Sequence, residues 1–180
     1  MILTKEDLKR YLDADQEAMD IRRKFRFVDR FSNPVWHFQR LLRKREYIYN
    51  TRFWWTPFAK KWNAFWYHRL ERRLGFTIHP NCFGPGLYIT HYGTLVVHSS
   101  ARIGKNCEIN VGVNIGSRDG DSNQVPIIGD NCFIGPGVKI FGKVVIGDNV
   151  KIGANAVVNK SFPEGNCTLV GIPAKAIRRM

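Results

Sequence analysis

The sequence predicts a mainly β protein whose chain winds into a parallel β-helix behind an α-helical N-terminal region. The main observation is a six-residue period, in which one apolar register holds Ile128, Ile134, Ile140, Ile146, Ile152 and Val158. An α-helix repeats its apolar positions every three or four residues and a plain strand every second residue, so a sustained period of six fits neither. The period therefore indicates a chain that coils.

A second apolar position, two residues before the first, indicates how each coil is built. It holds Cys132, Val138, Val144, Val150 and Ala156. Alternate residues of a strand point to the same side, so each hexapeptide is a short strand that buries two side chains and ends in a turn. Glycine often follows the main position, as in Ile134-Gly135, where a chain that turns a corner benefits from the missing Cβ. Three such edges close a triangular coil.

The segments around this pattern resemble a known family. They are Phe83-Gly84-Pro85-Gly86-Leu87, His91-Tyr92-Gly93-Thr94, Val111-Gly112-Val113-Asn114-Ile115-Gly116, Ile152-Gly153-Ala154-Asn155-Ala156 and Gly171-Ile172-Pro173-Ala174-Lys175. Over about residues 76 to 177 the chain resembles the hexapeptide-repeat acyltransferases, in the serine O-acetyltransferase-like branch that includes polysaccharide O-acetyltransferases. The resemblance implies a left-handed β-helix, a homotrimer, and acetyl-CoA in the groove between neighbouring subunits.

We expect three regions along the chain. Residues 1–75 form an α-helical, basic and aromatic N-terminal region, in which Thr4-x-x-Asp7 marks one helix start, Pro34 and Pro57 open two further helices, and Gly75 closes the last. Residues 76–166 form the left-handed β-helix acetyltransferase domain, with a loop at 117–126. Residues 167–180 form a C-terminal extension.

The N-terminal region carries most of the net charge. Residues 21–75 hold fifteen Lys and Arg against three acidic residues, and they hold all five tryptophans. One interpretation is a helical cap whose aromatic residues cover the first coil. The other is peripheral contact of residues 21–75 with an anionic membrane surface, because basic residues interleaved with Trp and Phe suit the headgroup region. No nucleic-acid-binding motif occurs, so we expect no nucleic-acid partner.

Targeting and cysteine patterns favour a cytoplasmic protein, at the inner face of the membrane if the second interpretation holds. No apolar run approaches the roughly 20 residues that span a bilayer, and the charged N-terminus does not fit a secretory signal. Cys82, Cys107 and Cys132 fall on inward positions, no Cys-x-x-Cys occurs, and Cys167 lies outside the register. We therefore expect reduced core thiols and no metal.

Two breaks in the period are the places where we expect chemistry, because solenoids put insertions on one functional face. One is the loop at 117–126. The other lies between Ile89 and Val97 and contains His91, which we predict to be the catalytic base. A neutral imidazole, with a reference pKa near 6.5, accepts the proton of an acceptor hydroxyl as its oxygen attacks a thioester. A hydrogen-bonded turn histidine is the alternative. No activated nucleophile is apparent, so we expect direct transfer in a ternary complex.

Candidate binding residues surround this base. For acetyl-CoA they are Gly116, a backbone donor to the oxyanion, then Gly135, Gly153 and Ala154 along one edge, and Lys175 as a partner for phosphates. Ordinary corner geometry is the alternative explanation for the small residues. For the acceptor they are Thr90, Tyr92 and Asp119.

Two departures from serine acetyltransferases favour a different acceptor. Those enzymes have aspartate where Thr90 stands and a second histidine where this chain has Val125, and the ammonium group of serine needs a carboxylate partner. We therefore expect acetyl transfer to a hydroxyl of a saccharide in surface polysaccharide biosynthesis. Serine O-acetyltransferase of cysteine biosynthesis is one alternative, and a non-catalytic trimeric β-helix scaffold is another.

Overall fold

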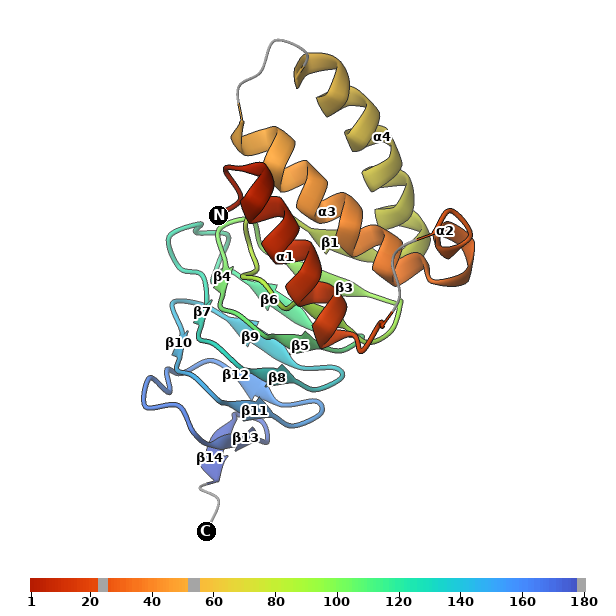
Figure 1. Cartoon of the computed structure of the whole chain (residues 1–180). Coiled ribbons are helices and arrows are strands. Elements are labelled where there is room, and N and C mark those ends of the chain that lie inside the picture. The colour runs from red at the N-terminus through yellow and green to blue at the C-terminus, as the bar shows by residue number, and fades with distance from the viewer. Residues whose placement is uncertain (23–25, 52–55, 178–180) are drawn as a thin grey trace.

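The structure is a computed structural model that describes residues 1–22, 26–51 and 56–177 of the chain. A group of helices sits at one end of an elongated coil of short strands, and the last described strand lies at the other end (Figure 1). The prediction of hexapeptide β-coils behind an α-helical N-terminal region is confirmed.

The described helices begin and end at signals that the sequence carries. They are α1 (Lys5–Ala18), α2 (Asp29–Ser32), α3 (Pro34–Asn50) and α4 (Thr56–Leu74). Thr4 caps α1 through a capping box with Asp7, and Pro34 occupies the first turn of α3. Gly75 follows α4 with a φ of +78°, a conformation that glycine adopts without strain.

Fourteen strands in the described residues form three sheets around the coil. The first sheet contains β1 (Phe76–Ile78), β3 (Leu95–Val97), β6 (Asn114–Gly116), β9 (Lys139–Phe141) and β12 (Val157–Val158). The second contains β4 (Arg102–Ile103), β7 (Ile127–Ile128) and β10 (Val145–Ile146). The third contains β2 (Tyr88–Ile89), β5 (Glu108–Ile109), β8 (Phe133–Ile134), β11 (Lys151–Ile152), β13 (Thr168–Val170) and β14 (Lys175–Ile177). Successive strands pair in parallel, and only β14 runs antiparallel to its neighbour.

The interior of the coil is the predicted apolar register. Its members from Ile128 to Val158 are at most 2% exposed, and they stack in one cluster with the second apolar positions. Cys82, Cys107 and Cys132 are buried free thiols of this core, as predicted, and burial raises the pKa of the Cys82 thiol to about 11. Cys167 is half-buried beside the core and forms no disulfide.

The cap interpretation holds for α3. Phe38 and Leu42 of α3 belong to the same core cluster as the first coil, and Trp36 is buried. It does not account for the outer side of α4, where Trp62 and Trp66 are 61% and 38% exposed. Trp54 and Trp55 lie outside the described residues.

The coil continues beyond residue 166. Strand β13 still pairs in parallel with β11, and its Leu169 is fully buried. Only with β14 does the chain turn back, since Lys175 pairs antiparallel with Val170. The segment 167–180 thus contributes a strand to the coil before it leaves.

Candidate active site

The predicted break around His91 is a long corner between the third and first sheets. Ile89 pairs with Ile109 and Val97 pairs with Ile115 in the next coil. Ile89 and Val97 are eight residues apart, whereas their partners Ile109 and Ile115 are six apart, so the upper corner holds two extra residues. We call residues 90–94 the His91 corner.

The helical region and the next coil both hold this corner. The amide of Gly93 donates to the Leu74 carbonyl at the end of α4 (2.8 Å), and the amide of Thr90 donates to the Ile109 carbonyl (3.2 Å). Gly93 has a φ of +141°, and a Cβ there would lie 2.3 Å from a methyl group of Val111. Residues with a side chain rarely adopt this φ, and an added Cβ would also displace the Val111 side chain, so the corner favours glycine.

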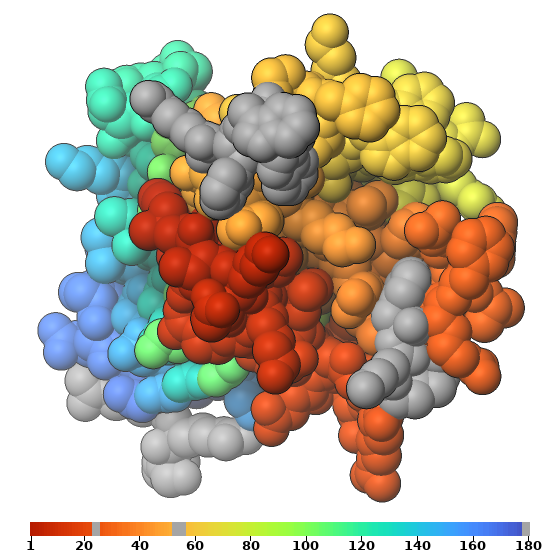
Figure 2. Space-filling model, turned by 45° about the horizontal axis from the view of Figure 1, so that its top comes forward, coloured from red at the N-terminus to blue at the C-terminus, as the bar shows by residue number. Residues whose placement is uncertain are grey.

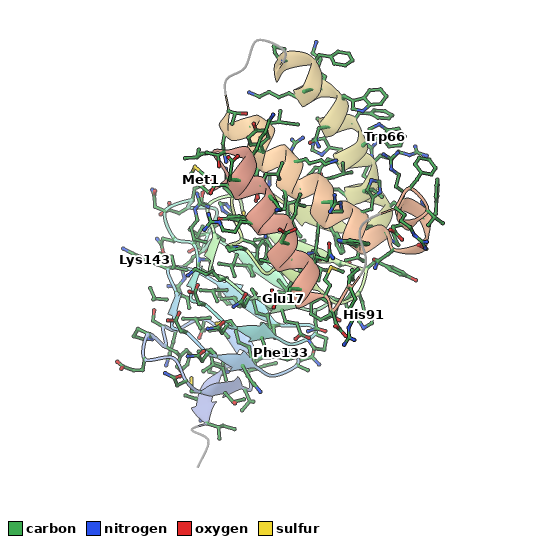
Figure 3. The ribbon with its side chains drawn as sticks, viewed as in Figure 1. Met1, Glu17, Trp66, His91, Phe133 and Lys143 are labelled. Atoms are coloured by element: carbon green, nitrogen blue, oxygen red, sulfur yellow. The ribbon has the colours of Figure 1, made fainter. Side chains whose placement is uncertain are left out.

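The side chain of His91 is exposed and projects from the edge of the coil near the C-terminal end of α1 (Figure 3). Within the described part of the chain its ring makes no hydrogen bond or ion pair. Tyr92, beside it, is 69% exposed. The alternative of a hydrogen-bonded turn histidine therefore has no support here, and the imidazole is open to an incoming hydroxyl group.

Thr90 lies next to the base, but its hydroxyl is already engaged. It donates to Oδ1 of Asn110 (2.8 Å), while Nδ2 of Asn110 donates to the Ile134 carbonyl (3.1 Å). Thr90 is half-buried and ties the His91 corner to the two coils below. No sequence pattern marks Asn110, because its role depends on contacts between coils.

The small residues predicted along one edge do lie on one corner, in the column headed by His91. In each coil the residue that leaves the third sheet donates its amide to the coil below: Asn110 to Ile134, Gly135 to Ile152, and Gly153 to Leu169. A Cβ on Gly135 would lie 2.7 Å from the Ile152 carbonyl oxygen. Coil stacking therefore suffices to explain this glycine, and its role in coenzyme binding stays a prediction.

Lys175 lies at the far end of the same column. It is exposed on β14, which is five strand spacings below β2 in the third sheet. At about 4.8 Å per spacing, Lys175 lies roughly 24 Å from the level of His91. Only an elongated ligand could contact both residues within one subunit.

Gly116 and Asp119 lie on a different corner. Gly116 ends β6 in the first sheet, and the loop that follows runs to β7 in the second sheet. Figure 1 places this loop on the opposite side of the coil from the corner that carries His91 in Figure 3. One chain does not bring Asp119 to His91, so a site that uses both needs two subunits.

The two aspartates of this loop differ in their bonding. Asp121 accepts from the amide of Asn123 (2.8 Å) and from the side chain of Gln124 (3.3 Å). Asp119 is exposed at a φ of +51° and makes no hydrogen bond within the described residues. Its carboxylate is the one available to a ligand.

Neither the cavity beside the helices nor the metal-ligating side chains of the described residues add a site to the His91 column. A cavity of about 570 Å³ lies between the helices and the first coil and is lined by Tyr11, Glu46 and Asn81, away from His91. The described residues contain no group of three His, Cys, Asp or Glu side chains placed to hold a metal ion.

Comparison with known proteins agrees with this architecture. Residues 126–160 match the family described as bacterial transferase hexapeptide (six repeats). The chain is 39% identical over 113 residues to a serine acetyltransferase of Synechococcus elongatus, covering 61% of this chain and 46% of the relative. It is 38% identical over 107 residues to a serine acetyltransferase of Helicobacter pylori, covering 58% and 62%. The chain thus spans about half to three-fifths of the length of these relatives.

Solved structures extend the likeness over the N-terminal helices. The serine acetyltransferase of Neisseria gonorrhoeae has a TM-score of 0.77 and 28% identity, covering 98% of this chain and 68% of that chain. The enzyme of Brucella abortus in complex with coenzyme A has a TM-score of 0.75 and 30% identity, covering 97% and 69%. Fold and repeats define the class, the hexapeptide-repeat transferases. Within that class the chain belongs to the serine acetyltransferase family.

The expectation of a saccharide acceptor is wrong. The curated relatives reported above are serine acetyltransferases, and a Neisseria gonorrhoeae structure with 28% identity, a TM-score of 0.75 and coverage of 96% of this chain and 70% of that chain is a complex with serine. The error came from the weight given to Thr90 and Val125 as lost contacts. A carboxylate missing at one position of one chain can be supplied by another part of a site that two subunits share.

Proposed function

We propose that this protein is an acetyl-CoA-dependent O-acetyltransferase that acts on the hydroxyl group of serine in the cytoplasm. The observation that carries the proposal is the column on one corner of the coil, with the open imidazole of His91 at its head and Gly135, Gly153 and Lys175 below. Two related structures support it, one bound to coenzyme A and one bound to serine.

In this proposal His91 acts as the general base. Its neutral imidazole removes the proton from the serine hydroxyl while the oxygen attacks the thioester carbonyl of acetyl-CoA. The tetrahedral intermediate collapses with cleavage of the carbon–sulfur bond, and the imidazolium returns the proton to the departing thiolate. O-Acetylserine and coenzyme A leave, and the enzyme carries no acyl group.

The coenzyme in this proposal lies along the His91 column, in a groove between two subunits of a homotrimer. Gly153 and Ala154 allow an extended arm to approach the backbone, and Lys175 faces the phosphates. The neighbouring subunit supplies the corner that carries Gly116, whose amide is the candidate donor to the oxyanion.

We assign Asp119 of the neighbouring subunit as the partner of the serine ammonium group. Thr90 offers no carboxylate, and its hydroxyl is engaged with Asn110. Asp121 is engaged within its own loop, whereas Asp119 makes no hydrogen bond within the described residues. Tyr92 is the further candidate acceptor contact in the His91 corner.

Steady-state assays with acetyl-CoA and L-serine test the base. We expect His91→Ala to lower kcat by roughly 10²-fold or more, with an unchanged melting temperature. His79→Ala is the matched control, because His79 is also exposed but lies in another corner of the first coil. Unchanged turnover in His91→Ala would remove His91 from the mechanism. Absence of acetyl transfer by the wild-type protein would support the non-catalytic scaffold.

The same assay tests Asp119. We expect Asp119→Asn to raise KM for serine by about tenfold or more, with a smaller change in kcat, because the lost charge-assisted contact is made in the ground state. Asp121→Asn is the control for loop structure. An equal effect of both substitutions would assign Asp119 to the shape of the loop instead.

A further inference from the structure

Helix α4 has two faces with opposite properties. One face packs inward through Asn63, Tyr67, Leu70 and Leu74, which are all at most 7% exposed. The opposite face presents large aromatic side chains to solvent, although each apolar residue left in water forgoes the free energy of burial. These are Phe58, Trp62, Phe65 and Trp66, at 77%, 61%, 58% and 38% exposure.

The aromatic rings form a continuous group. Trp62 and Trp66 meet edge to face with ring centroids 6.2 Å apart, and Phe65 and Trp66 do so at 5.4 Å. Figure 2 shows ring side chains of α4 on the surface, and Figure 3 shows Trp66 projecting away from the molecule. Folding leaves this group intact and accessible, so it is available to a partner.

Basic side chains surround and continue the aromatic group. Lys61 is exposed beside the aromatic group, and Arg69 and Arg73 extend the same helix face toward its C-terminus. The acidic residue of α4, Glu71, is held by His68 and by the amide of Ile78. The face therefore has an unbalanced positive charge.

A second exposed aromatic pair adds to this face. Phe27 and Phe31, at the short helix α2, are 70% and 68% exposed, and the guanidinium of Arg30 lies 4.8 Å from the centroid of the Phe27 ring. Figures 1 and 2 place α2 on the same side of the molecule as the C-terminal end of α4. We call these residues of α2 and α4 together the aromatic-basic face.

We propose that the aromatic-basic face docks the protein on the surface of an anionic lipid bilayer. Aromatic rings are stable at the boundary between headgroups and acyl chains, and Lys and Arg are attracted to anionic headgroups within a Debye length. The contact is peripheral: among the described helices, none has the length and apolarity to cross a bilayer.

Charge argues against a second copy of the chain as the occupant. A two-fold interface brings the same patch of both subunits together, so the Arg and Lys side chains of α4 would face one another. An anionic surface instead pairs with them. In the homotrimer proposed above, three such faces at one end of the assembly would add their affinities through effective concentration.

Vesicle flotation of the full chain at low salt tests this proposal. The vesicles contain equal parts of phosphatidylcholine and phosphatidylglycerol, or phosphatidylcholine alone. We expect retention on the anionic vesicles, weaker retention on the neutral ones, and release by added salt. Failure of the wild-type protein to float with the anionic vesicles overturns the proposal.

Matched variants separate this face from general charge. Arg69→Glu with Arg73→Glu should lower partition to the anionic vesicles by about tenfold or more. Lys143→Glu with Lys160→Glu makes the same change of net charge on exposed sites of the β-helix and should leave most binding intact. Equal losses in the two double variants would overturn the proposal, since the attraction would then belong to the whole molecule.

A second pair of variants tests the aromatic group. Trp62→Ser with Phe65→Ser should abolish salt-resistant retention, whereas Ile127→Ser with Val145→Ser, two exposed apolar residues of the second sheet, should not. Circular dichroism checks folding. If light scattering shows that the first pair lowers the oligomer mass, the face is an interface between copies and the proposal fails. Serine acetylation in solution does not depend on this result, so the two proposals stand or fall separately.

Discussion

Arg43 of α3 and Asp15 of α1 form a fully buried, bidentate ion pair, with Nε to Oδ2 at 2.7 Å and Nη2 to Oδ1 at 3.0 Å. Arg43 also donates to the carbonyls of Phe83 and Gly84. Burial by itself lowers the pKa of Arg43, but Asp15 and Glu46 together raise it above its ordinary value. The pair joins two helices to the chain that leads into the His91 corner.

Replacement of Arg43 should weaken the whole N-terminal cap. Arg43→Met leaves the carboxylates of Asp15 and Glu46 buried without their partner, and we expect a loss of about 3–5 kcal/mol in the free energy of unfolding. Urea unfolding followed by tryptophan fluorescence measures it. Arg10→Met, which removes an exposed ion pair with Asp7, should change little. Comparable stability of the two variants would contradict this account of the buried pair.

At the open edge of the third sheet, the side chain of Gln39 makes the hydrogen bonds that a neighbouring strand would otherwise make. Its side chain donates to the Leu87 carbonyl (2.7 Å) and accepts from the Ile89 amide (3.2 Å), two residues before His91. Gln39→Leu should cost about 1–3 kcal/mol, because both buried groups lose their partner. As a positioning residue, Gln39 should also affect kcat more than KM.

Amide exchange separates these two effects. We expect faster exchange of the Ile89 amide in Gln39→Leu, while the Ile109 amide in the next coil is unchanged. Gln39→Glu can still accept from Ile89 but cannot donate to Leu87 when ionised. If kcat is unchanged in both variants while stability falls, Gln39 serves the cap only and does not position His91.

The sequence predicted the repeating features of the fold but not the contacts between segments that lie far apart in the chain. The register from Ile128 to Val158, the thiols and the unusual corner at His91 follow from local spacing. Gln39 and Asn110 carry no such signal, because their partners lie 48 and 20 residues away or more in the chain. The acceptor was predicted wrongly for a related reason: the prediction rested on Thr90 and Val125 alone, whereas in the proposed site the acceptor contacts come from two corners that a single coil keeps apart.

A column of asparagine side chains should stabilise the corner between the second and third sheets. Asn149 accepts from Nδ2 of Asn131 (3.2 Å) and donates to Oδ1 of Asn166 (3.0 Å), at a φ of +58°. Asn149→Ala should be about 1–2 kcal/mol less stable than Asn149→Gly, because only alanine is strained at positive φ. Thermal unfolding measures the difference.

Asn114 provides the reverse comparison. It is an exposed residue of strand β6, where an extended backbone disfavours glycine. There the glycine variant should be less stable than the alanine variant by about 0.5–1 kcal/mol. If Asn149→Ala were as stable as Asn149→Gly, the left-handed backbone at these corners would not be the reason for asparagine there.

His37 should make the protein sensitive to mild acid. Burial, followed by the nearby cations Arg30, Lys44 and Arg40, lowers the pKa of His37 from 6.5 to about 4. Between these values the unfolded chain binds a proton at His37 that the folded chain does not. The free energy of unfolding is therefore unaffected by this proton above pH 6.5 and decreases as the pH drops toward 4. Solvent screening makes the loss smaller than the full shift, since the side chain is only half-buried.

Urea midpoints measured across this range should fall less steeply in His37→Asn than in the wild-type protein, whereas His79→Asn, at an exposed site, should keep the wild-type slope. Parallel slopes in all three proteins would assign the acid sensitivity to other groups.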